Sequence, residues 1–148
     1  MRALLIYNPK AGRGTSAKLA KEAVTLFREH GITLEPRPLQ LGVNPFEDAL
    51  DTELAVVCGG DGSINYVVNC MRSLGINPTL GIVPMGTAND LANALDIPHN
   101  SNMALRRILE GKEHYIDCCK VNDRYFVNIL SFGIFTTTSQ HTPEQLKH

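Results

Sequence analysis

One carboxylate set among glycines is the feature of this sequence best suited to chemistry. It lies in the segment Gly59-Gly60-Asp61-Gly62-Ser63, directly after the apolar run 54–58. Glycines strip side chains from the backbone, so a bulky anion can reach its N–H groups. The carboxylate could hold Mg²⁺ through water or take a proton from a hydroxyl nucleophile. Asp61 is therefore the candidate catalytic residue and metal ligand, with capping of its own helix as the alternative role.

Another glycine-rich loop, the first in chain order, follows the apolar run at 3–7, so the loop at 59–63 is the second along the chain. It reads Asn8-Pro9-Lys10-Ala11-Gly12-Arg13-Gly14-Thr15. Its proline defines the exit from a strand, its asparagine and backbone offer neutral hydrogen bonds, and Lys10 or Arg13 offers positive charge. These groups suit phosphate binding, although a plain turn with solvated basic residues would show the same pattern.

A third loop, Pro84-Met85-Gly86-Thr87-Ala88-Asn89-Asp90, follows the apolar run 80–83. We expect Thr87 to cap the next helix, at about 88–95, and Asp90 suits the positive end of that helix's dipole. Asn89 is a poor helix former, so its place here favours a role in binding.

The elements that position these loops alternate between strand and helix. Apolar runs at 3–7, 32–34, 54–58 and 80–83 predict strands, with the second ended by Pro36 and Pro38. Helical spacing predicts a helix over 16–30, ended at Gly31, another after Ser63, and one capped by Ser101 or Asn102. This order predicts a Rossmann-like, three-layer α/β domain with a mostly parallel sheet. Loops at the carboxyl ends of such strands commonly bind ligands.

The pattern changes after Gly111. Residues 114–121 and 124–130 flank an Asn122-Asp123 turn and predict a hairpin. We therefore expect two units: a nucleotide-binding α/β domain over 1–112, and the truncated start of an antiparallel β domain over 113–148.

Composition excludes several classes of function. The formal net charge of the 148 residues is −1, so no global basic field attracts nucleic acid. No apolar run approaches the roughly 20 residues of a membrane span. The four cysteines lack metal-ligand or disulfide spacing, which predicts reduced thiols in the core of a cytoplasmic protein.

A dinucleotide-binding motif is a rival interpretation. Residues 12–17 loosely match the G-x-G-x-x-G/A fingerprint, and Glu35 lies near the expected ribose-binding acid. This match begins late in the turn and leaves the second and third glycine-rich loops unexplained.

Taken together, the three loops resemble the signature blocks of the diacylglycerol kinase catalytic domain family, in order and in spacing. The resemblance covers nearly the whole chain. It implies Mg²⁺-dependent transfer of the ATP γ-phosphate to a lipid hydroxyl. Phosphates would lie against residues 59–63, and Asn8 and Thr87 would contact the nucleotide. The full candidate binding set is Asn8, Pro9, Lys10, Gly12, Arg13, Gly59, Gly60, Gly62, Ser63, Gly86, Thr87, Asn89 and Asp90.

The resemblance also implies partners and a location. These are a lipid substrate such as diacylglycerol, transient contact with the inner membrane face, no nucleic acid, and a homo-oligomeric state. Members of the family are typically about twice as long, with a general base in their second domain. We therefore expect this chain alone not to be fully active.

Two further features keep alternatives open. The family usually has a nucleotide-binding threonine between its second and third strands, and the segment 40–45 has none. An NAD kinase-like phosphotransferase shares a similar Gly-Gly-Asp-Gly loop and is the nearest enzymatic alternative. A non-catalytic nucleotide-binding module derived from the family is the other.

Overall fold

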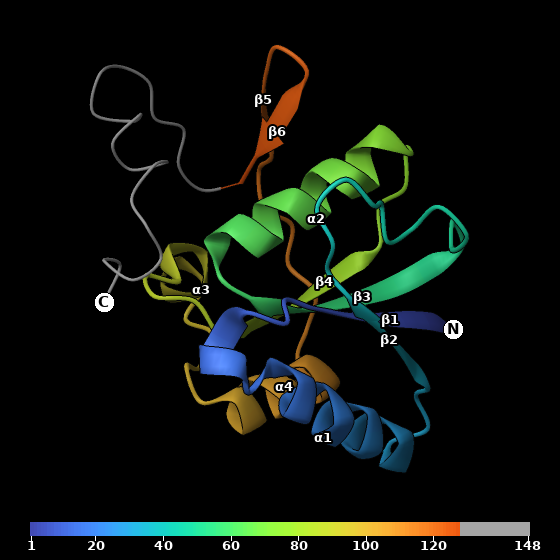
Figure 1. The fold of residues 1–148 in the computed structure, drawn as a ribbon, viewed down its shortest axis with the longest axis vertical. Helices are drawn as coiled ribbons and strands as arrows, with labels where there is room; N and C mark the ends of the chain where they lie inside the picture. Colours follow the sequence, from blue (N-terminus) through green and yellow to red (C-terminus); the bar gives the residue numbers. More distant parts are fainter. Residues whose placement is uncertain (128–148) are drawn as a thin grey trace.

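Four parallel strands form the sheet that positions the glycine-rich loops. The structure is a computed structural model that describes residues 1–127. The strand order is β2-β1-β3-β4, and every neighbouring pair is parallel (Figure 1). The strands are β1 (Arg2–Tyr7), β2 (Leu34–Pro38), β3 (Thr52–Gly59) and β4 (Thr79–Pro84).

Helices cover both faces of this sheet, which confirms the predicted three-layer α/β architecture (Figure 1). α1 (Ser16–Glu29) and α4 (Ser101–Glu110) pack on one face, while α2 (Asp61–Ser73) packs on the other. The short helix α3 (Asp90–Ala94) adds Leu91 and Ala92 to the α2 side of the core. A four-residue 3₁₀ turn, Ala11–Gly14, precedes α1.

The central strands are apolar throughout because both of their faces are buried. Leu4 and Ile6 of β1 pack toward α2, while Leu5 between them packs toward α1. α1 ends where predicted, since Gly31 adopts a φ of +78° that a side chain would disfavour.

The second strand differs from its prediction. Pro36 does not end it but lies inside β2, and Pro38 is its last residue; they pair with Leu5 and Tyr7 of β1. β2 is an edge strand with β1 as its one neighbour in the sheet. The two prolines alternate along it, so each missing N–H falls on the side that has no partner strand.

Two predicted helix starts are also wrong by a few residues. Thr87 does not cap α3, because Asn89 takes a left-handed conformation and the helix begins only at Asp90. α4 is capped by Asn100, whose side chain accepts a hydrogen bond from the N–H of Met103 at 3.0 Å.

The predicted hairpin is present in shorter form. β5 (Cys119–Val121) and β6 (Arg124–Phe126) pair antiparallel around Asn122-Asp123. Residues 114–118 are not a strand, and residues 128–148 of the predicted second domain lie outside the described part.

The cysteines divide into two groups. Cys58 and Cys70 are buried as predicted, and burial raises the pKa of the Cys58 thiol to about 12. Cys118 and Cys119 are exposed, so the prediction that all four lie in a core is wrong. Both stand at the start of the hairpin, away from the sheet that buries the others.

Candidate functional site

The strand order reverses its direction at one edge of the sheet. From β1 the chain passes through α1 to β2 on one side, and from β3 it passes through α2 to β4 on the other. The two connections leave in opposite directions, so the carboxyl ends of β1 and β3 form a topological switch point, where open α/β sheets bind ligands. The first two glycine-rich loops lie at these ends.

Hydrogen bonds join all three loops to one another. The N–H of Gly12 donates to the carbonyl of Met85 at 3.3 Å, and the N–H of Met85 donates to the carbonyl of Gly59 at 2.9 Å. Asn8 donates from its side chain to the hydroxyl of Ser63 at 3.5 Å. Segments far apart in sequence therefore form one continuous rim.

The glycines of this rim serve different purposes. A Cβ on Gly60 would lie 2.9 Å from the Cα of Gly86, and a Cβ on Gly86 would lie 2.5 Å from the Cα of Gly60. These two glycines let the second and third loops pack backbone against backbone. A Cβ on Gly62 would meet nothing within 4 Å. Within the second and third loops, Gly62 is thus the glycine with open space where a side chain would lie.

Unused backbone donors lie in the same turn as Gly62. α2 has 13 residues, and its first intrahelical bond runs from the N–H of Ile64 to the carbonyl of Gly60 at 3.1 Å. The N–H groups of Asp61, Gly62 and Ser63 have no acceptor among residues 1–127. Free N–H groups at the positive end of a helix dipole form a site suited to an anion such as phosphate.

Asp61 has a structural partner that the sequence did not reveal. Its two carboxylate oxygens accept hydrogen bonds from the N–H groups of Asp90 at 3.0 Å and Leu91 at 3.1 Å. Asp61 thus caps α3 rather than its own helix. Each oxygen has a second lone pair, so the same carboxylate can also bind water or a proton.

Asn89 acts on the backbone of its own loop. It is 5% exposed, with a φ of +53°. Its side chain accepts from the N–H of Gly86 and donates to the carbonyl of Gly86, both at 2.8 Å. Asn89 therefore shapes the loop that presents the exposed Thr87, rather than facing solvent itself.

Positive charge is available at the first loop. Lys10 and Arg13 are exposed, and neither forms an ion pair with another residue in the described part of the chain. The loop backbone is held in place by Asn8, whose side chain accepts from the N–H of Lys10 at 3.0 Å. Both cations stay free to interact with an anion at this edge of the sheet.

Sequence reasoning missed Ser16, which anchors this loop. Its side chain is fully buried, and its hydroxyl donates to the carbonyl of Asn8 at 2.7 Å. The one signal in the sequence was its position as the first residue of the predicted helix.

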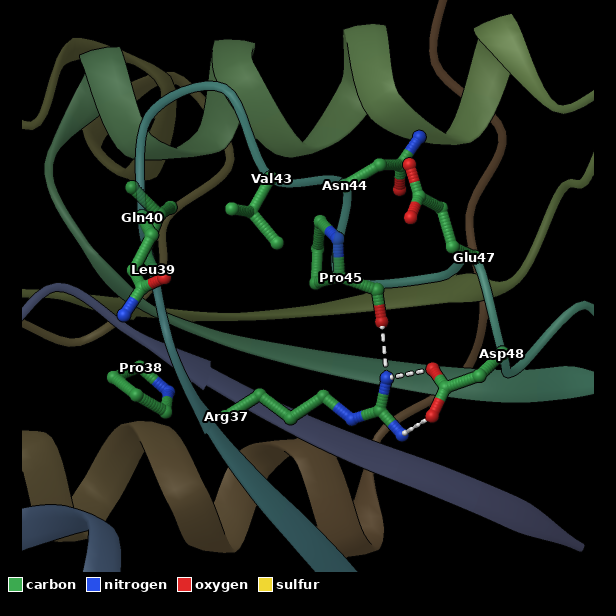
Figure 2. A pocket seen from close by; sticks show the side chains of 9 residues that line it. All are labelled: Arg37, Pro38, Leu39, Gln40, Val43, Asn44, Pro45, Glu47 and Asp48. Atoms are coloured by element: carbon green, nitrogen blue, oxygen red, sulfur yellow. Dashed lines mark hydrogen bonds and ion pairs between the residues drawn. The ribbon is translucent and has the colours of Figure 1, made fainter.

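A separate hollow of about 250 Å³ lies beside the end of β2 (Figure 2). It is lined by residues of 37–48, none of which belongs to the glycine-rich loops. Its arginine, Arg37, is bonded to the carboxylates of Glu35 and Asp48 and to the carbonyl of Pro45. These bonds raise the pKa of Arg37 and lower that of Asp48. Because Arg37 is neutralised, this hollow is not an anion site, and Glu35 is not free for a ribose.

Metal-ligand clusters and membrane-spanning helices are both absent from residues 1–127. Among residues 1–127, no three His, Cys, Asp or Glu side chains gather as metal ligands. The helices of the described part are too short or too polar to cross a membrane.

The parallel sheet, with helices on both faces and glycine-rich loops at its switch point, defines a three-layer α/β protein. The family model described as "Diacylglycerol kinase catalytic domain" matches residues 2–121. The chain belongs to this family, as its three loops suggested.

Relatives agree with this assignment. A diacylglycerol kinase of Staphylococcus epidermidis is 35% identical over 151 residues, covering 99% of this chain and 48% of its own. One from Staphylococcus carnosus is 32% identical, with 99% and 49% covered. The crystal structure of a diacylglycerol kinase from Bacillus anthracis str. Sterne aligns with a TM-score of 0.72 at 30% identity, covering 84% of this chain and 45% of that one. The chain thus spans about half the length of these relatives.

Proposed function

We propose that this chain forms the ATP-binding part of a lipid kinase that phosphorylates the hydroxyl of diacylglycerol or a similar lipid. Family membership supports the reaction class. The observation that carries the proposal is the N-terminus of α2, where free N–H groups adjoin the open space at Gly62. A nucleotide phosphate would bind these groups and be partly neutralised by Lys10 and Arg13.

The other rim residues have supporting roles in this proposal. Asn8 and Thr87 would contact the nucleotide directly. Asn89 and the glycines at 60 and 86 would act through the loop backbone that they shape. Pro9, Gly12 and Asp90 complete the candidate rim. They would contribute shape and charge to the site, with no defined contact to the nucleotide.

Magnesium fits this site through one protein ligand. Asp61 keeps free lone pairs beside its two capping bonds, and Mg²⁺ commonly binds one or two carboxylates together with waters and substrate phosphates. When bound, the ion would offset the negative charge of the transferring phosphate. Asp61 would hold it, through water, at the edge of the sheet that carries the loops.

The proposal extends to organisation and partners. We divide the chain near residue 112, because the exposed segment 111–118 separates the α/β unit from the hairpin. A lipid substrate implies transient contact with a membrane surface, and ATP as donor places the reaction at its cytoplasmic side. We also propose that the chain assembles as a homo-oligomer.

Isothermal titration with Mg-ATP tests the nucleotide assignment. We expect Lys10→Ala to weaken ATP binding roughly fivefold, as loss of about 1 kcal/mol of screened attraction would, with a smaller difference at high salt. Lys18→Ala is the matched control, since Lys18 is an exposed lysine paired with Glu22 on α1. Equal affinities for the wild type and both variants would contradict the role of Lys10.

Transfer of labelled phosphate tests the reaction. The wild-type chain and any longer form are assayed with diacylglycerol, sphingosine and NAD as acceptors. Labelled diacylglycerol supports the proposal. Labelled NAD would instead favour the NAD kinase-like alternative, and ATP binding without transfer by the longer form would favour a non-catalytic module.

A further inference from the structure

In the described part of the chain, a single side chain hydrogen-bonds the β5–β6 hairpin to the α/β unit. Asn69 of α2 donates to the carbonyl of Tyr125 at 2.8 Å and accepts from the N–H of Tyr125 at 2.9 Å. Its second amide hydrogen bonds the carbonyl of Asn65 at 2.8 Å. Among residues 1–127, no other hydrogen bond joins the hairpin strands to the α/β unit.

The register of the hairpin explains why Asn69 fits. Val121 and Arg124 flank a two-residue turn, and Cys119 pairs with Phe126, so these pairs exchange the hydrogen bonds of the ladder. Tyr125 lies between them, and its N–H and carbonyl therefore point away from β5. At Tyr125, the side chain of Asn69 makes the two hydrogen bonds that a neighbouring strand would make on this edge of β6.

The ring of Tyr125 reinforces the same contact. The guanidinium of Arg72, also on α2, lies 5.2 Å from the ring centroid, while the ammonium of Lys120, within the hairpin itself, lies 5.3 Å from it. Both distances suit cation–π attraction. Tyr125 and Val127 also pack against the core cluster on the α2 face of the sheet.

The chain that leads into the hairpin adds little to this attachment. Residues 111–118 are exposed throughout, and Tyr115 is 96% exposed. Within residues 1–127, their one side-chain hydrogen bond runs from the hydroxyl of Thr79 to Glu113 at 2.6 Å. The position of the hairpin therefore depends on its docking to α2, beside which it stands in Figure 1.

We propose that Asn69 is a positioning residue for phosphoryl transfer. It holds the hairpin, where the expected second domain begins, at a set place relative to the proposed phosphate site at the N-terminus of the same helix. Asp61 and Asn69 lie about 12 Å apart along α2, at 1.5 Å per residue. A rigid helix thus links the phosphate site to the hairpin. The positioning role rests on the proposed kinase function, whereas the docking role does not.

Hydrogen exchange of the complete chain tests the docking. Asn69→Leu has a similar size but leaves the N–H and carbonyl of Tyr125 unpaired. Loss of two hydrogen bonds of ordinary strength corresponds to about a ten- to thirty-fold change in the docking equilibrium. We expect amides of residues 119–126 to exchange at least tenfold faster in this variant, with β1 and β3 unchanged. Hairpin exchange equal to the wild type would overturn the proposal.

Tyr125→Phe is the matched control, since it keeps the backbone bonds to Asn69 and the aromatic ring. We expect its hairpin exchange to match the wild type. Asn69→Asp retains the acceptor for the N–H of Tyr125 but loses the donor, so its exchange should lie between wild type and Asn69→Leu. If all three variants exchange alike, Asn69 does not dock the hairpin.

Kinetic measurements distinguish a positioning role of Asn69 in phosphoryl transfer from a purely structural role. In the lipid phosphorylation assay, we expect Asn69→Leu to lower kcat at least tenfold, while the Kd for Mg-ATP changes less than twofold. An unchanged kcat with a freed hairpin would refute the positioning role. A wild-type chain that binds no ATP would refute the proposed function, and hydrogen exchange would still decide the docking role.

Discussion

Replacing Gly62 with alanine adds one methyl group in the first turn of α2. The backbone there is helical, and the new Cβ would meet no protein atom within 4 Å. Alanine is favoured over glycine by up to about 1 kcal/mol in a helix interior. Near the helix end we expect a gain of about 0.5 kcal/mol in the free energy of unfolding, or roughly 1–2 °C in Tm.

The same methyl group should weaken nucleotide binding. It fills the space through which a phosphate would reach the N–H groups of Asp61, Gly62 and Ser63. Charge-assisted hydrogen bonds of this kind contribute about 1.5–3 kcal/mol each. Displacing the phosphate from one of them should raise the Kd for Mg-ATP at least tenfold.

Two measurements on Gly62→Ala check whether its stability rises while its affinity for Mg-ATP falls. Thermal unfolding without ligand reports the helix, and isothermal titration with Mg-ATP reports the phosphate site. Gly31→Ala is the matched control, because Gly31 lies at the far end of α1 with a φ of +78° and open space around its Cβ. It should lose about 1 kcal/mol of stability and keep its ATP affinity.

Two results for Gly62→Ala would contradict these expectations. If Gly62→Ala folds normally and binds Mg-ATP with the wild-type Kd, then phosphate does not lie against this turn. A marked fall in Tm for Gly62→Ala would instead show that the space around its Cβ is not open.

Three further changes test the rim and its surroundings. Asp61→Asn places an amide N–H₂ against a backbone N–H of α3, and urea unfolding should show a loss of about 1–3 kcal/mol; unaltered stability would refute the capping role. Gly86→Ala brings a Cβ within 2.5 Å of the Cα of Gly60. This should cost roughly 1–3 kcal/mol and weaken ATP binding, whereas a wild-type Tm would show that the loops can separate freely. Arg37 lowers the pKa of Asp48, so the stability from this pair is present above about pH 4, the unfolded value, and is lost as pH falls through the folded pKa. Asp48→Asn should therefore lower Tm at pH 6 but much less at pH 3, and an equal difference at both pH values would argue against the ion pair.

Local patterns predicted most of the elements correctly. The apolar runs of β1, β3 and β4 and the helical spacing of α1 are short-range signals that need no tertiary partner to be recognised. Errors occurred where a tertiary neighbour overrides local preference. Proline normally ends a strand, but β2 tolerates two because one of its edges has no partner strand.

The candidate site, too, could be predicted from local patterns only in part. That three glycine-rich loops lie at the carboxyl ends of parallel strands follows from their order in the chain. Their individual roles do not, because they depend on contacts between distant residues. Asp61 meets the backbone of Asp90, 29 residues away, and Asn69 meets Tyr125, 56 residues away.

The sequence by itself determined the class of fold, the order of the three glycine-rich loops and the family to which the chain belongs. Spacing and residue type carry that information, because a strand, a glycine turn and a helix N-terminus are local structures. Only the tertiary structure decided which glycine faces open space, which helix Asp61 caps and what holds the hairpin. Each of these depends on how closely two backbones approach, and that distance is set by packing across the whole sheet.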